Sequence, residues 1–307
     1  MNSKKVLITG STGFIGSHVV HGFVELGFEV IGISRTENHS PHVIKNICGD
    51  TDWSDVLEDV DIIVHCAAAV HKMDLSESVL QDYQQLNVEG TLNLADQAKA
   101  TVKRFIFLST VKVNGEETFG EKFCADSIPN PVDPYAISKA RAETGLREIA
   151  KSSKMEIVII RPPLAYGPNP KGNLEKLAKN LVRRMPLPFG SITYNSRSLL
   201  YVGNLVDFIC VCAEHKAAKN ETFLISDDSD LSTASIISLI GKSLDIRTIL
   251  LPVPVFILKL LFKILGKEEY RTRLLGNLCV DVTKNKELLD WKPKFSIQEG
   301  FHHSFKK

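Results

Sequence analysis

Residues 4–20 have the sequence KKVLITGSTGFIGSHVV, and this stretch decides the fold. Its apolar residues 5–9 predict a buried strand, and the residues that follow Gly13 predict an amphipathic helix. Between the two lies the spacing G-x-x-G-x-x-G, formed by Gly10, Gly13 and Gly16. Such a turn lets the backbone approach a pyrophosphate closely, and the free N–H groups of the following helix attract anions. A strand, a glycine-rich turn and a helix in this order predict a dinucleotide-binding site.

Apolar runs and amphipathic segments alternate outward from this turn through the first half of the chain. This alternation predicts a parallel sheet covered on both faces, and right-handed crossovers make the sheet doubly wound. The expected strands are 5–9, 28–33, 43–47, 61–66, 103–109 and 156–161. The expected helices are near 14–26, 53–58, 77–101 and 134–152. The fold class is therefore α/β with a doubly wound parallel sheet.

The pattern changes after Arg161, where RPPLAYGPNPKGN is rich in Pro and Gly and predicts a crossing loop. The elements expected next are a helix near 173–184, a core strand SLLYV, a helix 204–215 and a strand TFLIS. From Leu231 onward the chain is predicted to be helical and less regular. We therefore expect a nucleotide-binding domain of residues 1–166 with 193–227. A smaller, discontinuous α/β substrate domain would consist of residues 167–192 with 228–307.

Tyr135 and Lys139 lie four residues apart in DPYAISKARAE, so on a helix they share one face. An ammonium group beside a phenol favours the phenolate and lowers the tyrosine pKa. A tyrosine tuned in this way can exchange a proton near neutral pH, which suits interconversion of a carbonyl and an alcohol. Together with the glycine-rich turn, the pair predicts hydride transfer beside a nicotinamide.

The composition of the 307 residues is that of an ordinary globular protein, with 44% hydrophobic and 24% charged residues. The net charge of +1 offers no footprint for nucleic acid. The six cysteines lack disulfide or metal spacing and are expected to be buried free thiols, with no metal site. Two lysines lead directly into the first strand without a signal peptide, so we expect a cytoplasmic protein.

Residues 249–266, ILLPVPVFILKLLFKILG, form the most apolar segment of the chain. Prolines and the lysines Lys259 and Lys263 interrupt it, so no uncharged stretch approaches the roughly 20 residues that a membrane span needs. We expect a helix packed within the substrate domain. Contact with a membrane surface is the alternative.

The second expected strand ends at VIGISRTE, where NAD sites usually place an acidic side chain for the ribose hydroxyls. This chain has Ser34 and Arg35 there. A hydroxyl and a guanidinium suit the 2′-phosphate of NADP. Glu37 is close enough to serve the ribose instead, so we expect NADP(H), with NAD(H) as the alternative.

The whole chain resembles the extended short-chain dehydrogenase/reductase family, in its nucleotide-sugar epimerase and dehydratase branch. The resemblance implies a Rossmann fold and a nucleotide-sugar substrate. It rests on the order and spacing of VLITGSTGFIGS, GDTDW, DIIVHCAAAVH, LNVEGTLNL, FIFLSTVKVNG, PYAISKARAE, VIIRPPLAYGP, RSLLYVGNLVD and ELLDWKP.

The resemblance also implies roles for particular residues. Tyr135, Lys139 and Thr110 match the catalytic positions, and Asn87 matches the residue that supports the active-site helix. The implied cofactor contacts are Gly10, Gly13, Phe14, Ile15, Gly16, Ser34, Arg35, Asp50, Thr51, Ala67, Ala68, Ala69, Asn87, Ser109, Tyr135, Lys139 and Pro162. The implied substrate contacts are Thr110, Val111, Asn173 and Arg197, with Arg197 and Asn173 at the diphosphate.

Two departures bear on the reaction. UDP-glucose 4-epimerases usually carry Asn where this chain has Leu164, and they carry a late Arg-Pro-Gly-Asp stretch that is absent here. STVKVNGE, RPPLAYGP and LLPVPVFILKLLFKILGK look more like the 4-ketoreductases that form UDP-N-acetylquinovosamine for surface polysaccharides. They are also similar to epimerases of lipid-diphosphate-linked amino sugars. We therefore expect reduction of a UDP-linked 4-keto-6-deoxy amino sugar.

Other activities remain as alternatives. The first is 4-epimerisation of a UDP-sugar or of a lipid-diphosphate-linked hexosamine by the same residues. A 4,6-dehydratase usually has Asp-Glu beside the catalytic Thr, where this chain has Val111 and Lys112. A non-catalytic dinucleotide-sensing regulator would typically lack Tyr135 or Lys139. The resemblance also suggests a homodimer formed through helices 77–101 and 134–152.

Overall fold

The computed structural model describes residues 3–35, 42–69, 76–168 and 173–306. These residues form a seven-stranded sheet in the order β3-β2-β1-β4-β5-β6-β9, in which every neighbouring pair is parallel. The strands are β1 (Lys5–Thr9), β2 (Glu29–Ser34), β3 (His42–Ile44), β4 (Ile62–His65), β5 (Arg104–Leu108), β6 (Glu156–Arg161) and β9 (Thr222–Leu224). The doubly wound parallel sheet predicted from the sequence is confirmed.

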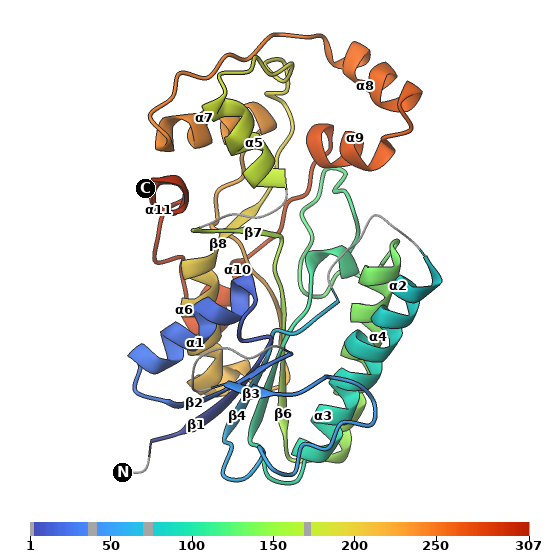
Figure 1. The fold of residues 1–307 in the computed structure, drawn as a ribbon, viewed down its shortest axis with the longest axis vertical. Helices are drawn as coiled ribbons and strands as arrows, with labels where there is room; N and C mark the ends of the chain where they lie inside the picture. Colours follow the sequence, from blue (N-terminus) through green and yellow to red (C-terminus); the bar gives the residue numbers. More distant parts are fainter. Residues whose placement is uncertain (1–2, 36–41, 70–75, 169–172, 307) are drawn as a thin grey trace.

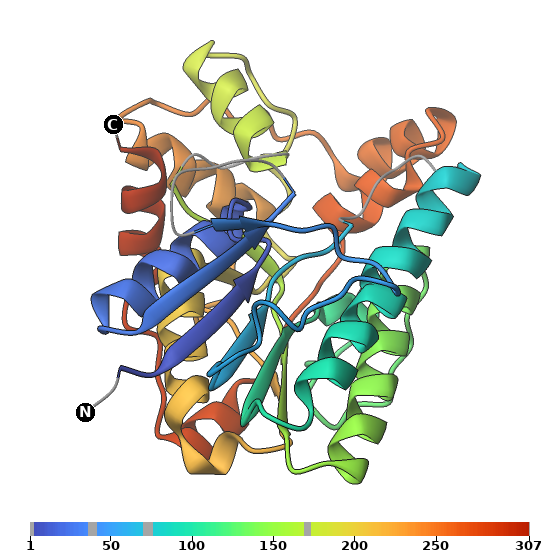
Figure 2. The same cartoon turned by 60° about the horizontal axis from the view of Figure 1, so that its bottom comes forward.

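Helices cover both faces of this sheet, and Figures 1 and 2 show the two layers. One face carries α1 (Phe14–Glu25) and α6 (Val202–Glu214), which pack on Val6, Ile8 and Val64. The other carries α3 (Thr91–Ala98) and α4 (Pro134–Ser152), which pack on Leu7, Ile63 and Phe105. Strands buried on both faces need continuous apolar runs, and β4 and β5 are buried at every position.

Most expected boundaries lie within a few residues of the observed ones, and β1, β6 and α4 agree to the residue. The helix expected near 53–58 is wrong. Residues 53–57 form a single hydrogen-bonded turn in which the N–H groups of Val56 and Leu57 both donate to the Trp53 carbonyl. Asp59 follows with a positive φ of 58°, which a continuing right-handed helix cannot accommodate.

The segment expected as helix 77–101 is helical but not uniform. It consists of α2 (Glu77–Asp82), the π-helix η1 (Tyr83–Gly90) and α3. A π-helical stretch opens the i to i−4 ladder by one residue and is frequently found at functional sites. Here it contains Asn87.

The remaining elements lie beyond the carboxyl ends of the strands, above the sheet in Figure 1. The expected crossing loop 161–173 contains a short strand, β7 (Leu164–Tyr166), which pairs in parallel with β8 (Leu199–Tyr201). The helices there are α5 (Asn173–Val182), α7 (Thr233–Ser243), α8 (Val255–Ile264), α9 (Glu268–Leu275) and α11 (Ile297–Phe305). Helix α10 (Thr283–Leu289) returns beside β9, and the short 3-10 turns are η2 (Val111–Val113) and η3 (Lys216–Ala218).

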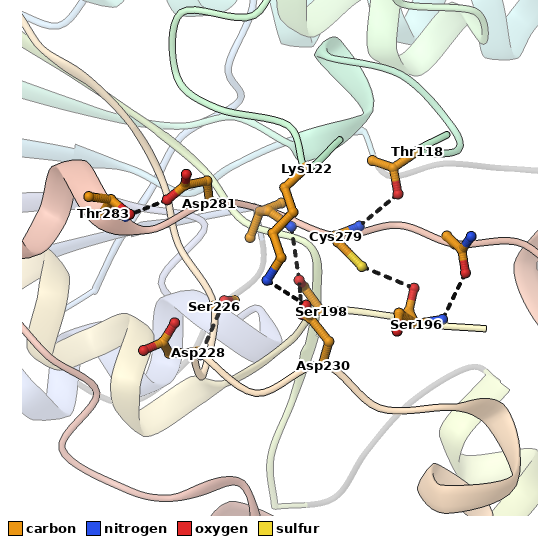
Figure 3. A network of polar contacts seen from close by, with 12 residues as sticks. Thr118, Lys122, Ser196, Ser198, Ser226, Asp228, Asp230, Cys279, Asp281 and Thr283 are labelled. Carbon is orange, nitrogen blue, oxygen red and sulfur yellow. Dashed lines mark hydrogen bonds and ion pairs between the residues drawn. The ribbon is translucent and has the colours of Figure 1, made fainter. Parts of the chain in front are cut away.

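A late segment of the chain, residues 277–283, passes between two earlier segments and joins them (Figure 3). The Cys279 N–H donates to Thr118 Oγ1 at 3.2 Å, and the Val280 N–H donates to Ser198 Oγ at 3.0 Å. The Asp230 carboxylate accepts from Ser198 Oγ at 2.6 Å and from Lys122 Nζ at 2.7 Å. This network fixes the position of Arg197, which lies between the two bonded serines Ser196 and Ser198.

Helix α8 packs against the segments expected for the substrate domain, but through one side only. Leu258 is its one buried residue, in a small cluster with Ile192 and Leu275. Phe256 and Ile264 are 71% and 72% exposed. Among the described residues, no helix combines the length and the apolar character that a membrane span requires.

Candidate active site

The glycine-rich turn between β1 and α1 has the shape that a dinucleotide requires. Gly10 has a φ of +66°, and a Cβ there would lie 2.9 Å from the Ala67 backbone. A Cβ on Gly16 would lie 2.1 Å from the Gly10 carbonyl oxygen. Gly13 begins the helix without a side chain to cap it, so the first N–H groups of α1, at Phe14 and Ile15, face no capping oxygen. These features fit a pyrophosphate at the helix N-terminus.

The other expected cofactor residues gather along the same edge of the sheet. Ala67 to Ala69 follow β4 directly, opposite the turn. Asp50 is exposed beside Thr51, whose hydroxyl donates to the Asn46 carbonyl at 2.9 Å and whose carbonyl accepts from Asn93 and Gln97 of α3. The loop that offers Asp50 is thus held in place by side chains of α3.

At the end of β2, Ser34 is buried and Arg35 is exposed. The guanidinium is therefore accessible to a ligand at the edge of the sheet. Glu37, the alternative ribose partner, lies outside the described residues. The geometry is compatible with either cofactor.

Asn87 joins the segment after β4, where we expect the cofactor, to helix α4, which carries Tyr135 and Lys139. Its Oδ1 accepts the Ala69 N–H at 2.8 Å, and its Nδ2 donates to the Ala69 carbonyl at 3.1 Å and to Ser138 Oγ at 3.0 Å. The Ser138 hydroxyl in turn donates to the Tyr135 carbonyl at 2.7 Å. The supporting role that the resemblance implies has a direct structural basis in these contacts.

His65, which the sequence analysis did not single out, holds the same region together from within the core. The Thr91 hydroxyl donates to the Asn87 carbonyl at 2.9 Å, so its oxygen must accept from His65 Nε2. His65 Nδ1 then accepts from the Thr9 hydroxyl, whose oxygen receives the Ala67 N–H. Burial lowers the pKa of His65 to about 3. The imidazole is therefore neutral and fixes the backbone at Ala67.

Helix α4 begins where the sequence predicts. The Asp133 carboxylate caps the helix by accepting the Ala136 N–H at 2.7 Å, and Pro134 occupies the first turn, where its missing N–H costs nothing. Lys139 then lies on the face of α4 that meets the sheet, and Tyr135, one turn earlier, lines the cavity described below. The Tyr135 ring packs 6.0 Å from the ring of Tyr83 in η1.

The electrostatic environment of this pair differs from the expectation. Burial raises the pKa of the Tyr135 phenol above its usual range, and the Asp133 carboxylate adds to the effect. Lys139 Nζ donates to the Leu108 carbonyl at 2.9 Å and lies 4.3 Å from the centre of the Phe107 ring. Burial lowers the pKa of Lys139 to about 8. In the protein alone the Lys139 ammonium is hydrogen-bonded to β5, and the net effect of burial and of the Asp133 carboxylate is a tyrosine pKa that is raised rather than lowered.

Ser109 and Thr110 follow β5 and face the catalytic helix. The Thr110 oxygen receives the Lys112 N–H at 3.3 Å, at the start of η2. The Ser109 hydroxyl donates to the Glu143 carboxylate at 2.5 Å. The Val111 N–H donates to the Pro162 carbonyl at 3.0 Å, which holds the end of β5 against the end of β6.

A cavity of about 570 Å³ opens above these residues, between the carboxyl ends of the strands and helices α5, α7 and α9. Thr110, Val111 and Tyr135 line one part of it, and Arg197 lines another. Asn173 is the first residue of α5, whose Leu174 and Leu177 line the cavity. The expected catalytic and substrate elements are therefore brought to one place.

Arg197 is fixed in this cavity by backbone contacts. Its Nη1 donates to the carbonyls of Gly276 at 3.2 Å and Thr272 at 3.4 Å. Burial lowers the pKa of Arg197, and the nearby Arg273 of α9 lowers it further. Arg273 also lines the cavity, together with Lys176 and Lys267. Glu116 lines the cavity as well. Two neighbouring guanidinium groups in a partly apolar cavity suit a diphosphate. The sequence analysis did not identify Arg273, because no motif marks helix α9 as part of a site.

Comparisons with known proteins show which family the chain belongs to. Residues 6–226 match the NAD dependent epimerase/dehydratase family. The chain is 42% identical over 306 residues to a UDP-glucose 4-epimerase of Vibrio cholerae, covering 97% of this chain and 93% of the relative. It is 31% identical over 281 residues to the N-acetyl-alpha-D-glucosaminyl-diphospho-ditrans,octacis-undecaprenol 4-epimerase of Escherichia coli O157:H7, covering 87% and 82% of the two chains.

Among solved structures, the fold is similar to that of UDP-glucuronic acid 4-epimerase from Bacillus cereus in complex with UDP-glucuronic acid and NAD. The TM-score is 0.80 at 23% identity, with 98% of each chain covered. At that identity the likeness shows the fold alone. With the family match over most of its length, the chain belongs to the NAD-dependent epimerase/dehydratase family and is an NAD-dependent enzyme of the short-chain dehydrogenase/reductase type.

Proposed function

We propose that the protein is a 4-epimerase of a diphosphate-activated hexose, which inverts the configuration at carbon 4 with a resident NAD. The observation that carries the proposal is the cavity itself. Thr110 and Tyr135 line it together with Arg197 and the nearby Arg273. A hexose bound between the two would have its diphosphate on the arginine and its ring near the phenol.

Bound NAD would accept a hydride from carbon 4 and return it to the opposite face. Tyr135 takes the proton of the 4-hydroxyl as the carbonyl forms, and gives it back as the alcohol is restored. The Thr110 hydroxyl orients the reacting oxygen. Inversion requires the 4-keto sugar to turn over, and a cavity of about 570 Å³ offers room for this.

The environment of Tyr135 gives the enzyme a way to couple proton transfer to cofactor binding. Its raised pKa keeps the phenol protonated in the protein alone. Removal of a proton from the sugar needs the phenolate, which requires positive charge nearby. Lys139, four residues along α4, and the charge of an oxidised nicotinamide would both supply it.

The relatives support epimerisation over reduction. The Vibrio cholerae relative, which is 42% identical over nearly the whole chain, is named a UDP-glucose 4-epimerase. The relative from Escherichia coli O157:H7 is named for inversion at the same carbon of a lipid-linked amino sugar. The two relatives are thus both named 4-epimerases, one for a sugar carried by UDP and the other for a sugar carried by a polyprenyl diphosphate.

The test is to supply sugars without added reductant and follow both the sugar and the nicotinamide absorbance. The panel contains UDP-glucose, UDP-N-acetylglucosamine and polyprenyl-diphosphate-linked N-acetylglucosamine. We expect inversion of at least one of them, detected by NMR, at constant absorbance. Failure to invert any of the three would contradict the proposal.

Reduction of a 4-keto sugar is the second candidate. Leu164 lines the cavity at the place where a polar Asn was expected for UDP-glucose 4-epimerases, and the exposed Arg35 suits NADP. A reductase would oxidise one NADPH for each alcohol formed. Stoichiometric loss of nicotinamide absorbance with a UDP-4-keto-6-deoxy amino sugar would establish this candidate instead.

The quaternary and domain organisation belong to the same proposal. We propose that residues 167–192 with 228–307 act as the substrate-binding unit. Helices α5, α7 and α9 belong to these ranges, and their side chains line the cavity. A homodimer would form through the helices of residues 77–101 and 134–152, which are α2, η1, α3 and α4. Sedimentation velocity of the purified protein tests the dimer.

A further inference from the structure

Helix α8 presents an apolar face to solvent. Phe256, Leu260 and Ile264 are spaced four residues apart, so they form one stripe along the helix. Leu260 is 57% exposed and the other two are exposed by more than 70%. Ile257 and Leu261 widen the stripe, and both are exposed. A contiguous exposed apolar surface of this kind indicates an interaction site.

The charges within the segment that contains this face have one sign. Residues 246–267 contain Arg247, Lys259, Lys263 and Lys267 and no Asp or Glu. The three lysines are exposed. The first acidic residues after them, Glu268 and Glu269, form ion pairs with arginines of their own helix. The face therefore joins large apolar side chains to cations alone, which complements an anionic lipid surface.

The position of α8 leaves this face accessible. It lies at the end of the molecule farthest from the sheet and apart from α2 and α4 (Figure 1). With 10 residues it is too short to cross a bilayer, but an amphipathic helix can lie in the interface between headgroups and acyl chains.

The same helix forms part of the wall of the substrate cavity. Phe262 lines the cavity, and Leu265 and Lys267 line it just after the helix ends. Thr110 and Tyr135 line that cavity too. One side of the α8 region thus faces solvent with apolar side chains, and the other side borders the space above the catalytic pair.

We propose that α8 docks the enzyme on anionic lipid bilayers and that the cavity receives a sugar diphosphate carried by a lipid of that bilayer. The diphosphate would bind the cations at Arg197, and the first carbons of the lipid would contact Phe262 and Leu265. The statement about the carrier rests on the proposed 4-epimerase function, whereas the docking surface does not.

The docking half is tested by sedimentation with vesicles of phosphatidylcholine alone or mixed with phosphatidylglycerol. The test variant is Phe256→Gln/Leu260→Gln/Ile264→Gln, since glutamine keeps a good helix propensity. The matched control is Phe119→Gln/Ile128→Gln/Val132→Gln, which removes three exposed apolar side chains at another place. Circular dichroism and thermal unfolding verify that both variants remain folded.

We expect the wild-type protein to bind the anionic vesicles, and binding to weaken as salt is raised. The α8 variant should bind at least tenfold more weakly, while the control binds as wild type. Lys259→Gln/Lys263→Gln should weaken binding to anionic vesicles specifically. Absence of wild-type binding, or equal binding by the α8 variant, would overturn the docking surface. Dissociation of a dimer by the α8 variant would show instead that a second copy covers the face.

The carrier half is tested by turnover of polyprenyl-diphosphate-linked N-acetylglucosamine in vesicles and of UDP-N-acetylglucosamine in solution. We expect faster inversion of the lipid-linked sugar, and at least a tenfold loss for the α8 variant on that substrate alone. Preference for the UDP-sugar, unaffected by vesicles, would overturn the carrier assignment while leaving the 4-epimerase function intact. No inversion of either sugar or of UDP-glucose, with vesicle binding retained, would instead reject the proposed function and the carrier assignment that rests on it.

Discussion

Glu143 of the catalytic helix and Arg161 at the end of β6 form a buried, two-pronged ion pair directly beneath the active site. Arg161 donates from Nε to Glu143 Oε1 at 2.9 Å and from Nη2 to Oε2 at 2.5 Å. Glu143 also accepts from the Ser109 hydroxyl, and Arg161 donates to Asn114 Oδ1. The pair therefore joins α4, β6 and the segment after β5, which together carry Tyr135, Lys139 and Thr110.

Breaking this ion pair should destabilise the fold. In Glu143→Gln the Arg161 charge stays buried without its counter-charge, which typically costs about 3–5 kcal/mol of unfolding free energy. Urea unfolding measures the loss. Glu148→Gln on the same helix removes a carboxylate whose side chain is 64% exposed, so it should change stability by less than about 0.5 kcal/mol. Equal effects of the two variants would mean that the ion pair contributes nothing to stability.

Removing the phenol hydroxyl should stop the chemistry without disturbing the fold. Tyr135→Phe should lower kcat by about two to four orders of magnitude, because the phenol is the group that we assign to exchange the proton. Cofactor affinity, measured by calorimetry, should survive. The control is Tyr194→Phe, at a tyrosine that is 57% exposed. Near-normal turnover by Tyr135→Phe would refute the assignment.

The pH profile should report on Lys139. Burial lowers its pKa to about 8, so the ammonium is mostly charged at pH 7 and loses its charge as the pH rises through 8. If the charge supports the phenolate, kcat/KM should fall above about pH 8. Lys139→Arg keeps a cation at every pH and should lack this alkaline limb, although its overall activity is lower. If kcat/KM of Lys139→Arg still falls above about pH 8, the group that titrates there is not Lys139.

Arg197 should control affinity for the diphosphate. Arg197→Ala should raise KM for the sugar diphosphate about 10- to 100-fold, the range expected for loss of a charge-assisted hydrogen bond. NAD affinity should be unchanged. Arg183→Ala removes an exposed cation of the neighbouring segment and should leave KM as it is. A lower kcat at unchanged KM would instead indicate that Arg197 acts on the reacting atoms.

Arg35 should matter for one cofactor only. Its exposed guanidinium lies at the end of β2, where a 2′-phosphate would be bound. Arg35→Ala should weaken NADP(H) binding by about 1.5–3 kcal/mol and leave NAD(H) binding nearly unchanged. Fluorescence titration with both cofactors measures this difference. Equal losses for the two would show that the guanidinium does not read the 2′-phosphate.

The sequence predicts those elements whose apolar pattern matches their burial in the folded protein. β1 and β6 are buried on both faces, so their apolar runs mark their ends, and α4 begins at an Asp-Pro cap that is visible in the sequence. β7 was missed because two prolines precede it and its three residues form a strand only through pairing with β8. The exposure of α8 could not be predicted either, because an apolar helix has the same sequence pattern whether or not other elements pack on it.

The site was predictable where a motif carries it and not where folding alone assembles it. The glycines, Tyr135 and Lys139 stand out in the sequence. No sequence motif marks the role of His65, because its hydrogen-bond partners Thr9 and Thr91 come from separate elements. The direction of the Lys139 ammonium depends on a carbonyl of β5, 31 residues away, so the expected lowering of the Tyr135 pKa could not be checked from spacing.

The segment around Cys279 sets the order in which the protein can become active. Its bonds to Thr118 and Ser198 close loops of 161 and 82 residues. Contacts of such long range form late in folding, after the local βα units. During synthesis the nucleotide-binding turn can be made early, but Arg197 is held in place only after residues 277–280 have left the ribosome. A nascent chain would thus form the proposed cofactor site well before the proposed diphosphate site at Arg197.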